Sequence, residues 1–201
     1  LRSAWEVLGT VSPDIAEAWG LPAHCHVHVG VHDSNACLAS YLDASAVDAS
    51  ALTVVSSGTW TVLMAPGAPT ATLQAERDML ANVDVLGRAT PTARFMGGRE
   101  FAHLLAGASP DAGTLADIAQ LLATQTLALP SFAAHGGPFA QRDGVVLRGG
   151  IPVTLAELPD GARAALAALY CALVTRWLVH QLWPQGGGAL HRVWWLRDRC
   201  P

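Results

Sequence analysis

The sequence predicts a layered α/β or α+β domain, and three observations support this. Short runs rich in β-branched residues alternate with stretches that carry helical start and stop signals. Two pairs of the β-rich runs are joined by glycine-containing turns typical of hairpins. Hydrophobic residues make up 51% of the 201 residues and charged residues only 14%, which provides a buried core and excludes a disordered chain.

The N-terminal elements carry the clearest boundaries. We expect Ser12 to cap a helix that begins at Pro13, and Gly20 to end it. A strand over 26–31 follows, because valine recurs at every second position, and it runs into a helix of small residues over 36–41.

The rest of the chain predicts strands over 52–56, 59–64, 82–86, 92–95, 145–147 and 193–196, and helices over 99–105, 114–122 and 159–183. The first two strands are expected to form a hairpin around Ser57-Gly58, and the next two a hairpin across Gly87-Arg88. The longest apolar stretch, 162–183, contains two arginines and a histidine, so a core helix explains it better than a membrane span.

Charge and cysteine content narrow the classes of function. A net charge of −4 without a basic patch argues against nucleic acid as a partner. Acidic residues and a proline within the first twenty positions do not fit a signal peptide, and no membrane partner is expected. The cysteines lack CxxC spacing, so we expect reduced thiols and a cytoplasmic location. They are Cys25, Cys37, Cys171 and Cys200.

The basic residues are all arginine, since the chain contains no lysine. P-loop and protein-kinase chemistry each need a lysine on the nucleotide phosphates, and Schiff-base chemistry needs one as nucleophile. These classes are therefore excluded for this chain. A nucleotide would have to be held by backbone N–H groups, hydroxyls and a metal ion.

Two segments have residue types suited to catalysis. In the first, Asp33 lies among small residues where a strand gives way to a helix, a position at which catalytic groups often lie and from which a carboxylate can accept a proton. The alternative is that Asp33 only caps the helix. In the second, Ser57-Gly58-Thr59 forms a tight turn whose N–H groups and hydroxyls could cradle an anion without lysine. The alternative there is an ordinary β-hairpin.

Together, in this order and at this separation, Gly30-Val31-His32-Asp33-Ser34-Asn35 and Ser56-Ser57-Gly58-Thr59-Trp60 resemble the second lobe of the FGGY carbohydrate kinases, with the rhamnulokinase-like branch as the nearest match. The motif before the strand, Val7-Leu8-Gly9-Thr10, and the apolar helix near Tyr170 fit the same family.

The resemblance implies an actin-like ATPase (ribonuclease-H-like) fold, of which this chain would be an incomplete C-terminal lobe. It implies that ATP with Mg²⁺ phosphorylates a hydroxyl of a small-molecule sugar, such as a ketose or a deoxyketose like rhamnulose. By position, Asp33 would be the general base and His32 and Asp33 would contact the sugar. Ser57, Gly58 and Thr59 would contact the nucleotide phosphates, and no metal-ligating residue is implied.

The sequence also departs from the family pattern. The first lobe with its own phosphate hairpin is missing, so we expect residues 1–183 to form a partial C-terminal lobe that is inactive alone and needs that lobe as its partner. The late glycine-rich loop does not follow the strand near 193–196. Residues 184–201 are therefore expected to be an anomalous tail, such as a reading-frame error near His191 would produce.

Two other interpretations stay open. His24, His26 and His28 alternate along one strand face, a pattern that can hold zinc in hydrolases. A non-catalytic nucleotide-binding module of the actin type is the other.

Arg99 and Glu100, after Gly97-Gly98, could border the cleft, although a solvated helix start is the simpler interpretation. Cys37 and Cys171 are expected to be small core residues.

Overall fold

The computed structural model describes residues 2–42, 52–184 and 192–197, and its centre is a mixed sheet with strand order β10-β3-β4-β6-β5. The strands are β3 (Leu52–Ser57), β4 (Thr61–Met64), β5 (Met79–Val83), β6 (Ala89–Phe95) and β10 (Arg192–Arg197). The β3–β4 and β5–β6 pairs are antiparallel hairpins, as predicted, although β5 lies three residues before the strand expected over 82–86. Strand β10 runs parallel to β3 along its whole length, from Arg192 opposite Leu52 to Arg197 opposite Ser57.

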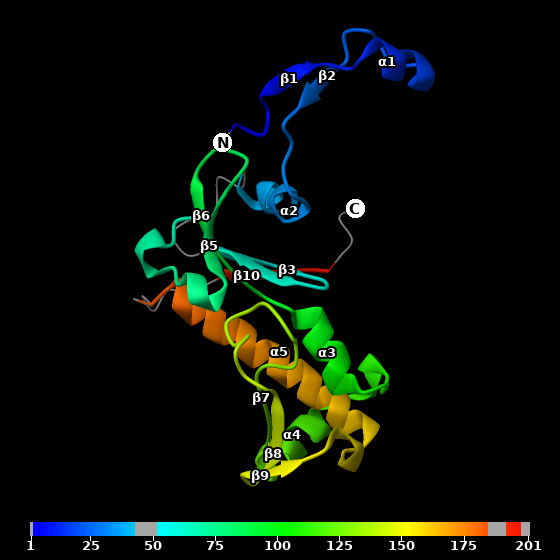
Figure 1. Cartoon of the computed structure of the whole chain (residues 1–201). Coiled ribbons are helices and arrows are strands. Elements are labelled where there is room, and N and C mark those ends of the chain that lie inside the picture. Colours follow the sequence, from blue (N-terminus) through cyan, green and yellow to red (C-terminus); the bar gives the residue numbers. More distant parts are fainter. Residues whose placement is uncertain (1, 43–51, 185–191, 198–201) are drawn as a thin grey trace.

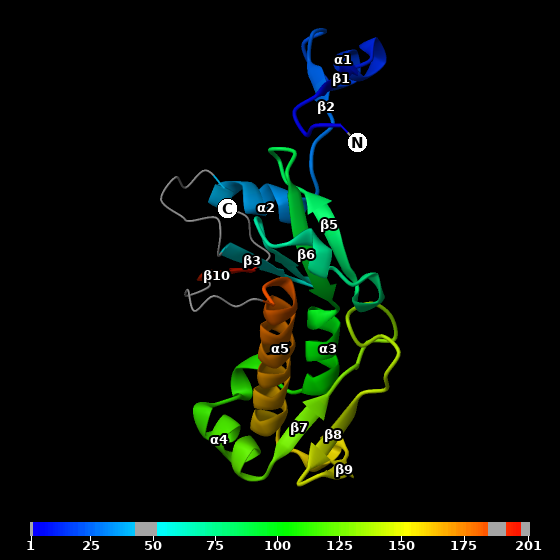
Figure 2. The same cartoon turned by 90° about the vertical axis from the view of Figure 1, so that its left-hand side faces the viewer.

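Helices cover both faces of this sheet. Helix α2 (Asp33–Leu42) lies on one face, and α3 (Gly97–Leu105) and α5 (Asp160–Leu182) lie on the other (Figures 1 and 2). Alternation along the strands explains the division, since neighbouring residues point to opposite faces. On the α2 face Leu38 packs against Val54 and Met64, whereas Val55 and Leu63 belong to the larger cluster on the other face.

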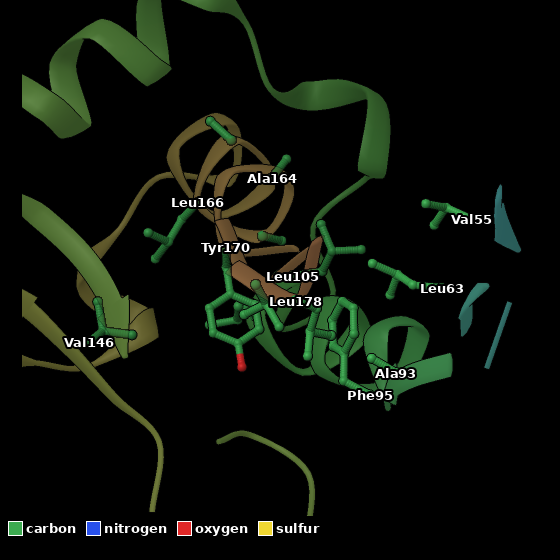
Figure 3. Close-up of a cluster of buried hydrophobic side chains, with 14 of the residues drawn as sticks. Val55, Leu63, Ala93, Phe95, Leu105, Val146, Ala164, Leu166, Tyr170 and Leu178 are labelled. Atoms are coloured by element: carbon green, nitrogen blue, oxygen red, sulfur yellow. The ribbon is translucent and has the colours of Figure 1, made fainter. Parts of the chain in front are cut away.

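The larger hydrophobic cluster joins the sheet to α3 and α5 (Figure 3). Phe95 and Leu63 from the sheet and Leu166 and Leu178 from α5 are almost fully buried in it. Helix α5 is long and apolar enough to cross a membrane by length and composition, and 44% of its most apolar window is buried inside the protein. Its packing against α3 and α4 makes it the core helix that the sequence predicted.

A smaller layer lies at the end of α5 that points away from the central sheet (Figures 1 and 2). It consists of α4 (Leu115–Ala123) and an antiparallel sheet of β7 (Thr126–Leu129), β8 (Val145–Arg148) and β9 (Ile151–Val153). Thr114 caps α4, because Thr114 and Asp117 form a reciprocal capping box. Short 3₁₀ turns occur at Thr70–Thr72, Ala75–Arg77, Pro110–Ala112 and Leu155–Glu157.

The N-terminal segment extends away from the rest of the protein (Figures 1 and 2). It is an antiparallel ribbon of β1 (Val7–Thr10) and β2 (His26–His28) joined by α1 (Pro13–Trp19). Gly20 ends α1 in the left-handed conformation, at φ 63°, as its position predicted. The predicted cap is wrong in detail, because the Ser12 side chain makes no capping hydrogen bond. The ribbon exposes large apolar side chains, Trp19 most of all at 76%.

Other differences from the sequence-based expectations are local. The strand expected over 26–31 ends at His28, and the helix expected from 36 begins at Asp33. Strands β1, β7 and β9 were not predicted, since each is only three or four residues long and has little periodicity to detect. The strand near 193–196, which lies in the part expected to be an anomalous tail, is paired with β3.

Candidate active site

Helix α2 places Asp33 over one face of the central sheet. Leu38 in the middle of the helix is completely buried against the sheet. At its N-terminal end the buried Asn35 donates from Nδ2 to the carbonyl oxygen of Val83, at 2.9 Å, on strand β5. An apolar anchor and a polar anchor therefore fix the direction of the helix, and with it the position of its first residue.

The Asp33 side chain is 87% exposed at this helix start. Its Oδ1 accepts a hydrogen bond from the Ser34 N–H at 2.6 Å and lies 2.6 Å from Nδ1 of His32. The first helical hydrogen bond runs from the Ala36 N–H to the carbonyl of His32, so His32 occupies the cap position. Asp33 is the first residue inside the helix, with a carboxylate that faces solvent.

The predicted phosphate turn joins β3 to β4. Thr59 is exposed and Gly58 and Trp60 are half-buried. The N–H of Gly58 donates to the carbonyl of Trp60 at 2.9 Å, so it closes the turn and does not point outward as expected. An anion would have to use other donors of the turn, such as the hydroxyl of Thr59.

Two glycines of α3 support this turn from below. A Cβ atom on Gly98 would lie 2.3 Å from the carbonyl oxygen of Gly58, and one on Gly97 would lie 2.1 Å from Oγ1 of Thr61. The start of α3 therefore contacts the turn so closely that a side chain has no room. This contact explains why two glycines occur together at the beginning of a helix, where they would otherwise be unfavourable.

The two predicted segments meet in one pocket of about 390 Å³. Its lining contains the catalytic candidate, parts of the turn and one arginine: His32, Asp33, Ser34, Ser56, Gly58, Thr59, Trp60, Val62 and Arg94. Ser57 is not among these residues. Since Ser56 pairs with Val62, which lines the same pocket, alternation places the Ser57 side chain on the opposite face of β3.

A second pocket, of about 410 Å³, adjoins the first at His32. It lies between the chain around Gly30 and the β5–β6 hairpin, and Asn35, Asn82 and Asp84 supply polar atoms to it. Asp84 is buried, and its carboxylate accepts hydrogen bonds from the backbone of the hairpin turn and from Arg88. This pocket therefore has rigid polar walls.

Arg94 and its neighbours were not singled out by sequence reasoning. The guanidinium carbon lies 4.8 Å from the centre of the Trp60 ring, and Nε donates to Oδ1 of Asp78 at 2.9 Å. Oδ2 of Asp78 in turn accepts from the N–H of Gly137 at 2.9 Å. No sequence signal marks these contacts, because Asp78 lies 16 residues from Arg94 and 59 residues from Gly137, and only the folded chain brings the three together.

Glu100 is buried, with 3% of its surface exposed, whereas its neighbour Arg99 is exposed. The expectation of a solvated helix start is therefore wrong for Glu100. Its Oε2 accepts hydrogen bonds from the Tyr170 hydroxyl and from the Phe132 N–H. These bonds tie α3 to α5 and to the loop after β7.

The same environment acts on Tyr170 and Cys171. Burial raises the pKa of Tyr170, and its hydrogen bond to Glu100 raises it further. Burial first, and the nearby Glu100 charge second, raise the pKa of the Cys171 thiol to about 12. Cys171 is therefore a protonated and unreactive thiol at neutral pH, as expected of a core residue. Cys25 and Cys171 form no disulfide, Cys37 is half-buried, and Cys200 lies outside the described residues.

The alternating histidines do not gather into a metal site in the described part of the chain. His26 and His28 have ring centres 6.3 Å apart, and Nδ1 of His28 bonds to the carbonyl of Trp5 at 2.8 Å. Among residues 2–42, 52–184 and 192–197, no group of three or more His, Cys, Asp or Glu side chains could hold a metal ion.

Comparison with known proteins agrees with the family resemblance of the two sequence segments. Residues 49–188 match the family model described as "Carbohydrate kinase FGGY, C-terminal domain". A carbohydrate kinase from Novosphingobium aromaticivorans is 32% identical, with a TM-score of 0.70 over 97% of this chain and 42% of that chain. A xylulose kinase from Rhodospirillum rubrum is 20% identical, with a TM-score of 0.63 over 98% of this chain and 44% of that chain. No curated protein matches the sequence. The chain spans less than half the length of these two structures.

Proposed function

The chain belongs to the FGGY carbohydrate kinase family, and from this premise we propose that it forms the second-lobe half of a site for ATP-dependent phosphorylation of a sugar hydroxyl. The family gives it the predicted actin-like ATPase fold. The observation that carries the proposal is the shared pocket, which places the Asp33 carboxylate and the β3–β4 turn around one space.

In this proposal Asp33 is the general base. A sugar hydroxyl is a weak nucleophile, so its proton must leave as the oxygen bonds to phosphorus. The Asp33 carboxylate is solvent-facing and can accept that proton, and a proton on Nδ1 of His32 would orient it at 2.6 Å. His32 lines both pockets. The sugar would therefore occupy the second pocket, beside Asn35 and Asp84, and the nucleotide phosphates would occupy the first pocket, beside the β3–β4 turn.

The pocket residues fit the nucleotide that the family implies. Hydroxyls of Ser56 and Thr59, the turn backbone and Arg94 suit phosphate oxygens. Mg²⁺ is commonly bound by one or two carboxylates together with substrate phosphates, but Asp33, the only carboxylate in this lining, is assigned to the sugar hydroxyl. When bound, the ion would neutralise charge on the transferred group. The ligands of the ion would come from the phosphates, water and the first lobe.

The complete enzyme would consist of this lobe together with a first lobe. The match to less than half of the related structures supports this, and so does the apolar surface of the N-terminal ribbon. We propose a ketose or deoxyketose as substrate and a cytoplasmic location. The rhamnulokinase-like branch stays a prediction, as does the division into residues 1–183 and a tail over 184–201.

Replacing Asp33 by Asn in the complete enzyme tests the proposal. Asn keeps the shape and can orient a hydroxyl, but it cannot accept the proton. We expect turnover to fall by about 10²-fold or more, with near-normal binding of ATP and sugar. Asp160→Asn is the matched control, since Asp160 is also an exposed first residue of a helix but lies in α5. Near-normal turnover in Asp33→Asn would contradict the proposal, and ATP binding without any sugar-dependent turnover in the wild type would favour a non-catalytic module.

A further inference from the structure

Arg94 lies on the face of the sheet that carries the candidate active site. It pairs with Val62 across β4 and β6, and Val62 pairs with Ser56 across β3 and β4. Directly paired residues of antiparallel strands point to the same face, so these three side chains form a row on the α2 side. All three line the pocket that contains Asp33, and Arg94 is the only arginine in that lining.

The Arg94 side chain is held from two directions. Its guanidinium lies 4.8 Å from the Trp60 ring centre, a cation–π distance, and Trp60 belongs to the β3–β4 turn. Its Nε is bonded at 2.9 Å to Asp78, which is 20% exposed and also binds the Gly137 N–H. Gly136 lies close against the Trp60 ring, because a Cβ there would lie 2.5 Å from Cη2 of the ring.

These contacts orient the Arg94 guanidinium but leave it accessible to a ligand. The Arg94 side chain remains 41% exposed. The hydrogen bond to Asp78 uses Nε, which leaves the two Nη nitrogens as donors for a ligand. A planar guanidinium with one edge held and another open is suited to binding phosphate oxygens through paired hydrogen bonds. A neutral sugar would gain far less from such a charge.

The absence of lysine also favours Arg94 as a phosphate-binding residue. Phosphoryl transfer depends on positive groups around the transferred phosphoryl, and a lysine often supplies one. This chain has no lysine, so arginine is the permanently charged side-chain cation that it can contribute.

We propose that Arg94 binds the nucleotide phosphates, with Trp60 and Asp78 as its positioning residues. The assignment rests on the proposed function, since it concerns the same pocket. It adds a phosphate-binding side chain to the turn, whose Gly58 N–H is engaged in closing the hairpin.

The test compares Arg94→Gln with Arg88→Gln in the complete enzyme. Arg88 is the matched control because it lies in the hairpin turn immediately before β6, is 51% exposed, and bonds from Nε to Asp84 at 2.8 Å, yet is absent from the lining of the Asp33 pocket. The measurements are KM for ATP, KM for the sugar, and the inhibition constant of adenosine, which has no phosphate. Melting temperatures show whether each variant is folded.

We expect Arg94→Gln to weaken ATP binding by about 10- to 100-fold, the range for a lost charged hydrogen bond, with little change for sugar or adenosine. Arg88→Gln should leave the constants for ATP and adenosine near those of the wild type. Arg94→Lys keeps the charge but loses the planar, two-pronged guanidinium, so its ATP affinity should lie between those of the wild type and Arg94→Gln. This variant provides the comparison if the Gln variant does not fold. An equal ratio of ATP to adenosine affinity in wild type and Arg94 variants would overturn the assignment. Wild-type enzyme without sugar-dependent ATP consumption would instead contradict the proposed function.

Discussion

Replacing Gly98 by Ala should reveal how closely α3 supports the phosphate turn. The new Cβ would lie 2.3 Å from the Gly58 carbonyl oxygen, 3.0 Å from its carbonyl carbon and 3.1 Å from Cα of Thr59. All three are backbone atoms, so no side chain can rotate away. Ordinary C···O contacts are about 3.3–3.6 Å, so the turn or the helix must move by roughly 1 Å.

Two opposing effects set the magnitude. Overpacking of this kind typically costs about 1–3 kcal/mol. Ala is favoured over Gly in a helix by up to about 1 kcal/mol, and less so at the second residue of α3. The net loss should therefore be roughly 1–2 kcal/mol. For a chain of this size, each kcal/mol lowers the melting temperature by about 2–4 °C.

Gly161→Ala is the matched control, since Gly161 is likewise the second residue of its helix, α5. Its Cβ would approach Oδ2 of Asp117 at 3.0 Å and the Ala112 carbonyl at 3.1 Å, which needs adjustments of only a few tenths of an ångström. Thermal melting by circular dichroism, at equal protein concentration, should show a drop for Gly98→Ala and almost none for Gly161→Ala. Equal melting temperatures would refute the close support of the turn.

Three further outcomes are expected. In the complete enzyme Gly58→Val should obstruct the approach of phosphate to the turn and raise KM for ATP more than KM for the sugar; unchanged ATP binding in calorimetry would make the turn purely structural. Replacing His24, His26 and His28 together by Gln should leave sugar phosphorylation largely intact, whereas stoichiometric zinc in the wild type that disappears with activity in the variant would favour a hydrolase. The 201-residue chain alone should self-associate through its exposed apolar surface and show no sugar-dependent ATP turnover, which light scattering and a coupled assay would check.

The sequence by itself determined the main elements and the two segments of the candidate site. Hairpins, helix caps and the core helix α5 depend on local spacing and on turn residues, so the chain around Thr114 or Gly20 already carries the signal. The lysine-free composition and the pairing of Asp33 with the serine–glycine turn were likewise readable without coordinates.

Only the tertiary structure decided which atoms share the pocket. Whether Ser56 or Ser57 lines it depends on the register of β3 with β4, and a shift of one residue would exchange them. The burial of Glu100 depends on α5, whose Tyr170 lies 70 residues further along the chain. The position of the Arg94 guanidinium depends in the same way on Asp78 and Trp60, which strand pairing brings next to it. Such contacts leave no periodic trace in the sequence, because the residues that form them meet only after the sheet and the helices have packed.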